Sequence, residues 1–276
     1  MDWFSIDLDV YPSDFSLVPI YDVHFGTRLH DKRLFQRVLD VIKNDPNCYF
    51  FLGGDLAEFI SHSDKRFEPD TLDPEFLANL DQLIDFSIDY IVRTFEPVKD
   101  RCLFIIGGNH DLRYYKKYGV DIVRRVAEGL GVKNYTRNYE ALVSISFRPY
   151  GKNKKTWRFN IYAHHGFGGG RKKGALVNNL EDLSGYFDAD IYIMGHSHQL
   201  LVTPKNVYKL NKTGTGLIVT NKLLIRVGGF RRSRGKVSSY EEERAMYPNA
   251  VGTVKIKPFF LDKPRNRLKF TAELLT

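Results

Sequence analysis

The sequence predicts an α/β fold, with a largely parallel β-sheet followed by a second, more antiparallel sheet. Through the first two thirds of the 276 residues, short apolar runs alternate with helical periodicity, as expected for strands joined by crossover helices. From about residue 205, polar and apolar residues alternate and the turns are rich in glycine, which is typical of antiparallel strands. No repeat, low-complexity tract or linker interrupts the chain, so we expect a single domain over residues 1–276.

Five short runs rich in β-branched, aromatic or leucine side chains are expected to be buried strands. They are residues 17–23, 48–52, 102–106, 157–163 and 191–194. A helix is expected where Leu34, Phe35, Val38, Leu39 and Ile42 share one face, and a longer one over residues 77–92 after Pro74. The period-two segments that predict the second sheet are 216–220, 222–227, 251–257 and 267–271, together with 141–147.

Composition excludes several classes of protein. The chain is 43% hydrophobic but has no apolar run near the roughly 18 residues of a membrane span, so we expect no membrane association. Asp2, Asp7 and Asp9 stand where a secretory signal would need a basic start, so we expect a cytoplasmic protein. Cys48 and Cys102 both lie in expected buried strands, which favours reduced core residues over a disulfide or a thiolate metal site.

Acids, amides and histidines stand where the five expected strands end. In parallel α/β sheets, ligand sites lie at the carboxyl ends of the strands. Six of the eight histidines follow an expected strand, which chance explains badly. Some of these residues have simple structural alternatives, because an acid such as Asp55 is often only a helix N-cap. The polar residues in question are Asp22, His24, Asp55, Glu58, Asn109, His110, Asp111, His164, His165, His196 and His198.

Five segments, in this order along the chain, resemble the five motifs of the calcineurin-like metallophosphoesterase superfamily. They are Asp22-Val23-His24, Gly54-Asp55-Leu56-Ala57-Glu58, Gly108-Asn109-His110-Asp111, His164-His165-Gly166 and Gly195-His196-Ser197-His198. The resemblance implies a four-layer α/β/β/α sandwich that holds two divalent metal ions about 3.5 to 4 Å apart. Oxygen and imidazole ligands without thiolate suit Mn, Fe or Zn, and the ligand types do not select among these three.

The resemblance also implies a ligand for each metal position. Asp22, His24 and His198 would hold the first ion, and Asp55 would bridge the two. Asn109, His164 and His196 would hold the second. His164 and His165 compete for one ligand position; we favour His164, and His165 would then support a ligand or face the substrate.

The expected reaction is hydrolysis of a phosphate ester by a hydroxide bound to both metals. His110 stands where the family places the general acid that protonates the leaving alcohol. Glu58 is found where several phosphatases of the superfamily have an acid that orients this histidine and where the repair nucleases usually have a histidine. Glu58 could equally be a solvated acid in the first turn of a helix.

The substrate class is less constrained. Lys and Arg outnumber Asp and Glu by 41 to 33, and basic residues cluster at 152–155, 171–173 and 231–236, with an aromatic and basic run at 113–117. Arg171, in a glycine-rich segment, could contact a phosphate. These features favour a phosphodiesterase or nuclease acting on DNA or RNA. The alternatives are a phosphatase or phosphodiesterase for small nucleotides or phosphoproteins, which Glu58 favours, and a non-catalytic scaffold, which the complete ligand set disfavours.

Overall fold

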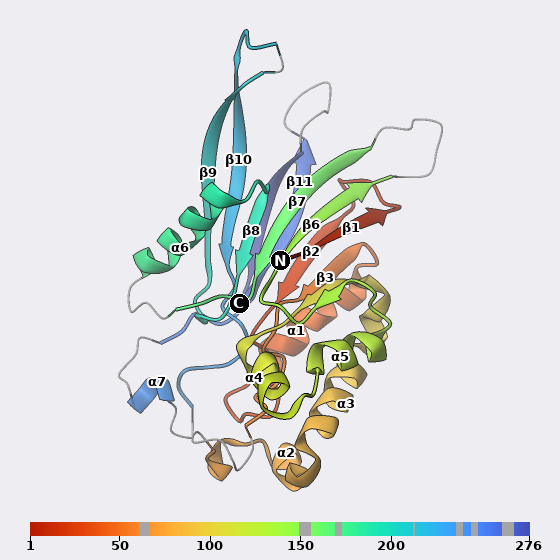
Figure 1. The fold of residues 1–276 in the computed structure, drawn as a ribbon, viewed down its shortest axis with the longest axis vertical. Coiled ribbons are helices and arrows are strands. Elements are labelled where there is room, and N and C mark those ends of the chain that lie inside the picture. The colour runs from red at the N-terminus through yellow and green to blue at the C-terminus, as the bar shows by residue number, and fades with distance from the viewer. Residues whose placement is uncertain are drawn as a thin grey trace.

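The computed structural model describes residues 1–60, 67–148, 156–168, 173–211, 213–235, 240–243, 248–260 and 268–276. Two six-stranded sheets form the centre of the molecule (Figure 1). Sheet A has the order β1-β6-β7-β8-β10-β9 and sheet B the order β12-β11-β2-β3-β4-β5. The strands of sheet A are β1 (Asp2–Leu8), β6 (Glu140–Phe147), β7 (Trp157–His164), β8 (Ile191–Met194), β10 (Leu217–Arg226) and β9 (Leu201–Leu210). Those of sheet B are β12 (Leu268–Leu275), β11 (Thr253–Phe260), β2 (Ser16–Ile20), β3 (Cys48–Leu52), β4 (Cys102–Ile106) and β5 (Tyr135–Thr136).

Helices cover the outer face of each sheet (Figure 1). Three of them, α1 (Lys32–Asn44), α3 (Leu83–Phe95) and α5 (Ile122–Leu130), bury apolar side chains against sheet B, and α6 (Lys173–Tyr186) does so against sheet A. The other helices are α2 (Pro74–Ala78), α4 (Asn109–Tyr118) and α7 (Tyr240–Glu243), and three short 3₁₀ helices are η1 (Pro69–Thr71), η2 (Leu80–Gln82) and η3 (Glu96–Arg101). The order of layers is therefore α/β/β/α, as the resemblance implied.

Central strands are buried on both faces, which explains why they are continuously apolar. On β2, Leu17 faces the core between the two sheets while Val18 faces the helices that cover sheet B. On β7, Ile161 faces the same core between the sheets, and its neighbour Tyr162 packs beneath α6. Successive side chains of a strand point to opposite faces, so only a strand with two covered faces lacks polar positions.

The expected division into a parallel and an antiparallel sheet is wrong. β2, β3 and β4 are parallel neighbours in sheet B, whereas β7 and β8 are parallel neighbours in sheet A. The later strands are also divided, because β10 joins sheet A and β11 and β12 extend sheet B. β6 runs antiparallel to β7. Both sheets are mixed, since side-chain periodicity reports how a strand is buried but not which strand it pairs with.

Element boundaries also differ in places from those expected. β1 and β9 were not expected, and segments 216–220 and 222–227 form the single strand β10. The long helix expected after Pro74 is divided into α2, η2 and α3. α2 ends where the Asn79 side-chain amide donates a hydrogen bond of 2.9 Å to the Glu75 carbonyl, because such a side chain competes with the helical backbone.

Two expectations from composition can be compared with the structure. No described helix has both the length and the hydropathy that crossing a membrane requires. Cys48 and Cys102 are free thiols; Cys48 is buried in the core between sheet B and its helices, and Cys102 packs against that core. Their expected role as core residues is confirmed.

Candidate metal centre

The candidate site lies where strands of both sheets end. Asp22 and His24 follow β2, Asp55 follows β3, and the Asn109 segment follows β4, all in sheet B. The histidine pair at the end of β7 and the segment after β8 come from sheet A. The Asp22 carboxylate joins the two sheets by accepting a hydrogen bond of 2.7 Å from the His196 backbone N–H. The two sheets therefore bring together motifs that are far apart in the sequence.

Strained backbone marks the site. Among the described residues, six that are not glycine have a positive φ, and five of these are candidate metal ligands. The Cβ atom makes a positive φ unfavourable for residues other than glycine. Such strain persists only where the surrounding structure imposes it, and it is concentrated at functional sites. The five are Asp22 (49°), His24 (51°), Asp55 (52°), His196 (67°) and His198 (50°).

Glycines allow the loops after β3 and β4 to approach each other. Gly54 has a φ of 91°, and a Cβ built there would lie 2.4 Å from the backbone nitrogen of Gly108. A Cβ on Gly108 would lie 2.2 Å from a carboxylate oxygen of Asp55. Any side chain at either position would push the two loops apart, which is why both motifs carry glycine before their polar residues.

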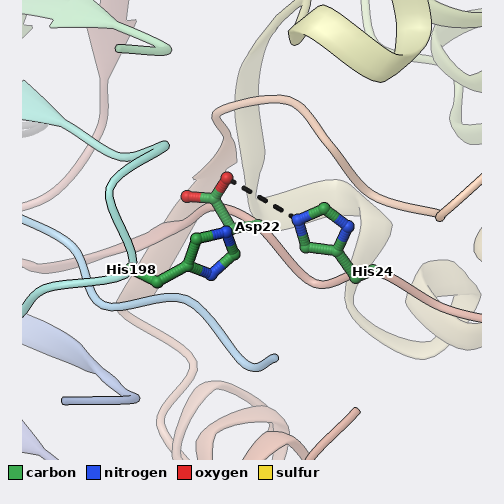
Figure 2. A group of neighbouring side chains, drawn as sticks. All are labelled: Asp22, His24 and His198. Carbon is green, nitrogen blue, oxygen red and sulfur yellow. Dashed lines mark ion pairs between the residues drawn. The ribbon is translucent and has the colours of Figure 1, made fainter. Parts of the chain in front are cut away.

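The first cluster of candidate ligands contains Asp22, His24 and His198, whose potential ligand atoms lie within 4.8 Å of one another (Figure 2). Asp22 Oδ1, His24 Nε2 and His198 Nδ1 are all buried and have no hydrogen-bond partner among the described residues. The other ring nitrogen of His24, Nδ1, donates a hydrogen bond of 2.7 Å to the carboxylate of Glu58. His24 Nε2 therefore faces Asp22 Oδ1, 4.0 Å away, while Glu58 holds the other side of the ring, which is the arrangement of a histidine that binds a metal with support from a carboxylate.

The second cluster contains Asn109, Asp55, His165 and His196. His165 Nε2 lies 3.0 Å from Asn109 Oδ1 and 3.3 Å from Asp55 Oδ2. His165 Nδ1 is 2.8 Å from the Gly53 carbonyl, which can only accept, so Nδ1 carries a proton. Asp55, His165 and His196 present atoms within 4.8 Å of one another. His165 Nε2 therefore faces two oxygen acceptors and donates a proton to them, and a cation bound among these residues would take the place of that proton.

The structure brings His165, and not His164, to this cluster. The side chains of β7 alternate, and those of Phe159, Ile161 and Ala163 face the core between the sheets, on the side from which His165 enters the site. His164 points to the other face of sheet A, where its Nδ1 accepts a hydrogen bond of 2.8 Å from the Gly166 N–H. Strand alternation decides which of two neighbouring histidines faces the site, so the geometry favours His165 over the expected His164 as the candidate ligand.

Glu58 and His110 are in contact, but not as expected. His110 Nδ1 donates to the backbone carbonyl of Glu58 at 2.6 Å, whereas the Glu58 carboxylate is bonded to His24. His110 Nε2 lies 4.0 Å from Asp55 Oδ2. The carboxylate of Glu58 therefore orients His24, and only its main chain orients His110. Glu58 is also buried and outside any described helix, so it is not a solvated acid of a helical first turn.

Burial and mutual charge determine the protonation states in the site. Burial raises the pKa of Asp22 to about 6. Burial would also raise the pKa of Asp55, but the charges of His165 and His110 hold it well below its usual range. Burial opposes the charged form of His165, yet Asp55 raises the pKa of His165 to about 10. Burial lowers the pKa of His196 to about 4. In the metal-free site His165 is therefore protonated and His196 neutral, and a divalent cation that binds to these residues would displace the His165 proton.

Three arginines stand outside the set of candidate metal ligands. Arg171, expected to bind substrate, lies outside the described residues. Arg231 was expected only as part of a basic cluster, but its Nε lies 3.9 Å from Glu58 Oε2. Arg226 was not singled out at all, and its side chain is fully buried next to Gly195. The signal for Arg226 was a cation in the expected strand segment 222–227, directly after three consecutive apolar residues.

The model of the calcineurin-like phosphoesterase family matches residues 22–200, which include all five motifs. The chain belongs to this family. No curated protein matches it. The matched region contains both clusters of candidate metal ligands.

Among the solved structures similar to this chain is a predicted phosphoesterase from Streptococcus pneumoniae. The two chains are 13% identical, and the alignment covers 95% of this chain and 90% of that one with a TM-score of 0.35. Another is a metallophosphoesterase from Sphaerobacter thermophilus, 11% identical, covering 94% of this chain and 88% of that one with a TM-score of 0.36. The assignment of this chain to the calcineurin-like phosphoesterase family rests on the family match and on the five motifs.

Proposed function

We propose that this calcineurin-like phosphoesterase is a hydrolase that holds two divalent cations, Mn, Fe or Zn, and cleaves phosphodiester bonds in nucleic acid. The observation that supports the metal site is a set of buried atoms that have no hydrogen-bond partner within the described part of the chain and that lie together in the first cluster: Asp22 Oδ1, His24 Nε2 and His198 Nδ1. Asn109, Asp55, His165 and His196 would hold the second cation, and Asp55 would be shared.

Two such cations supply, when bound, Lewis-acid stabilisation of the phosphoryl oxygens and a water of lowered pKa as nucleophile. The chain itself fixes the ligands in advance. The Glu58 carboxylate and the Gly53 carbonyl each hold the outer ring nitrogen of a candidate ligand histidine, His24 and His165 respectively. This fixes which nitrogen of each ring faces the site, so no reorientation is needed on binding.

His110 is the residue we assign to proton transfer with the leaving alcohol. Its Nδ1 is held by the Glu58 carbonyl, so Nε2 is the nitrogen left to exchange a proton. The ring also packs edge-on against His24, with 5.1 Å between centroids, which restricts its motion. His110→Asn should retain two metal ions but lose turnover most strongly on substrates with poor leaving groups. Equal loss on good and poor leaving groups would contradict this role.

Two basic segments border the site and support a polyanionic substrate. α4 begins at Asn109 within the site and exposes Arg113, Lys116 and Lys117. The helix also carries Tyr115, and the guanidinium of Arg137 covers one face of that ring at 4.0 Å, which adds a further cation beside the helix. Charge and aromatic surface beside the catalytic residues are what binding of a nucleic-acid strand requires.

The second segment contains Arg231, Arg232 and Arg234, and it supports the proposal less strongly. Arg232 is paired with Asp31 at 2.6 Å and Arg231 lies beside Glu58. The clusters at 152–155 and 171–172, and Lys236, lie outside the described residues. The alternative, a phosphatase or phosphodiesterase for small nucleotides or phosphoproteins, drew its support from Glu58 as a partner of His110. The bond between the Glu58 carboxylate and His24 argues against that pairing, whereas the presence of an acid where repair nucleases usually have a histidine still favours the alternative.

The deciding experiment measures hydrolysis of bis-p-nitrophenyl phosphate, p-nitrophenyl phosphate and linear DNA. Metal-stripped protein is reloaded with Mn²⁺, and Asp55→Asn serves as the inactive control. We expect cleavage of the diester and of DNA that is absent in the variant. Activity on the monoester alone would refute the nucleic-acid proposal, and inactivity on all substrates without Mn²⁺ binding would refute the metal-dependent hydrolase.

A further inference from the structure

Arg226 is a buried arginine at the end of β10, beneath the loop that carries His196 and His198. Its side chain is fully buried, with 0% of its surface exposed. Nη1 donates a hydrogen bond of 3.1 Å to the Gly195 carbonyl, and Nε donates one of 3.2 Å to the Leu176 carbonyl in α6. Nη2 has no hydrogen-bond partner among the described residues.

Burial at this position is energetically unfavourable for the charged guanidinium of Arg226. Burial lowers the pKa of Arg226 to about 10, and the negative charge of Asp22 acts in the opposite direction. Among the described residues, no carboxylate lies within ion-pair distance of the guanidinium, so backbone carbonyls are its direct partners. Buried charges are normally retained only where their hydrogen bonds organise something, because an apolar side chain of similar volume would often be as stable.

The carbonyl that Arg226 holds closes the turn between two candidate ligands. Gly195 O also accepts a hydrogen bond of 2.8 Å from the Ser197 N–H, so the turn spans His196. His196 and His198 both have positive φ angles within this loop. Gly195 itself is held on the other side, where its N–H donates to the His165 carbonyl at 2.9 Å. Arg226 thus anchors a strained turn to α6.

We propose that Arg226 is a positioning residue that holds the Gly195–His198 turn in the conformation in which His196 and His198 face the metal site. The inference rests on the proposed metal-binding function, since the turn matters because of its two histidines. Without the bond from Nη1, the strained φ angles of this turn would relax toward the favoured regions of the backbone. The two imidazoles would then lose their alignment before any metal binds.

The test compares Arg226→Met, Arg226→Lys and the matched control Arg101→Met. Arg101 also donates to two backbone carbonyls, those of Ile42 and Asp45, but away from the site. Urea unfolding of metal-free protein measures the stability of each variant, and calorimetric titration measures the Kd for Mn²⁺. Side-chain ¹⁵N signals of His196 and His198 are recorded in metal-free protein.

We expect Arg226→Met to weaken Mn²⁺ binding about 10- to 100-fold and to shift both histidine signals. Arg226→Lys should recover part of the affinity, because an ammonium can still donate to one carbonyl. Arg101→Met should leave affinity and signals unchanged whatever its stability. A purely structural role would change unfolding in both Met variants but not the affinity.

Unchanged affinity in folded Arg226→Met, with wild type binding Mn²⁺, would overturn the inference. If Arg226→Met does not fold, Arg226→Lys decides by the same comparison. If wild type itself does not bind Mn²⁺, the proposed function has failed, and the inference is then judged by the metal-free histidine signals. Signals at wild-type positions in the variant would overturn it.

Discussion

Glu58 allows the sharpest test of the site, because its carboxylate and its main chain contact different histidines. The carboxylate accepts a hydrogen bond of 2.7 Å from His24 Nδ1, with 4% of the His24 side chain and 11% of the Glu58 side chain exposed. A charge-assisted bond of this kind contributes about 1.5 to 3 kcal/mol, and water cannot easily replace it in a buried site. If this hydrogen bond stabilises His24 as a metal ligand, its loss should weaken metal binding about 10- to 100-fold.

The perturbations are Glu58→Gln and Glu58→Ala. Glutamine keeps an oxygen that can accept from Nδ1 but removes the charge, so we expect Mn²⁺ affinity to fall about tenfold. Alanine removes the acceptor altogether, and the fall should approach about 100-fold. The assay is calorimetric titration of metal-free protein with Mn²⁺ at pH 7.5. Glu128→Gln is the control, since 58% of that side chain is exposed.

Two results would refute this reasoning. If Glu58→Ala binds Mn²⁺ as tightly as wild type but loses turnover, the carboxylate serves His110 and not His24. If the variant loses one ion from the stoichiometry with the other unaffected, Glu58 is itself a ligand; the buried group of His24, Glu58 and His110 has the spacing for that. Graded weakening at full stoichiometry is the outcome that the bond to His24 predicts.

Three further predictions concern the ligands and the fold. His165→Asn should reduce the metal content by one ion per chain while His164→Asn leaves it unchanged, as measured by elemental analysis after dialysis; the opposite result would restore His164 as the ligand. Gly54→Ala should destabilise the metal-free protein by at least about 2 kcal/mol, because its Cβ would lie 2.4 Å from a backbone nitrogen at a φ of 91°. By contrast, Gly185→Ala in α6, where a Cβ meets nothing within 4 Å, should be neutral or stabilising. Thermal unfolding of the metal-free proteins compares the two variants. Burial lowers the pKa of His30 from 6.5 to about 4, so the unfolded chain binds more protons there and stability should fall by up to about 3 kcal/mol as pH falls from 6.5 to 4. His30→Gln should flatten that part of the curve in urea unfolding at each pH, and an unchanged slope would show that His30 is not held neutral.

Much of the fold could be predicted because burial leaves a local record. β3, β4 and β8 have the bounds expected from their apolar runs, and α1 buries the face that its periodicity predicted, with Asp31 as the N-cap that accepts a hydrogen bond from the Leu34 N–H. β1 was missed because only one of its faces is covered. It lies at the edge of sheet A, where it pairs with β6. A half-exposed edge strand has a weak pattern, so its existence depends on its partner.

The ligand set could also be predicted in outline, since each motif puts its polar residues at the end of a buried strand. The sequence alone determined the buried central strands, the family and the residue types that can bind a cation, because these depend on composition and spacing along the chain. Only the tertiary structure decided the rest. Whether His165 or His164 faces the site follows from the alternation of β7 against the core between the sheets. Glu58 supports His24 across the neighbouring strands β3 and β2 of sheet B, and Arg226 holds the turn at Gly195 across the neighbouring strands β10 and β8 of sheet A. Short-range sequence patterns carry no information about such contacts.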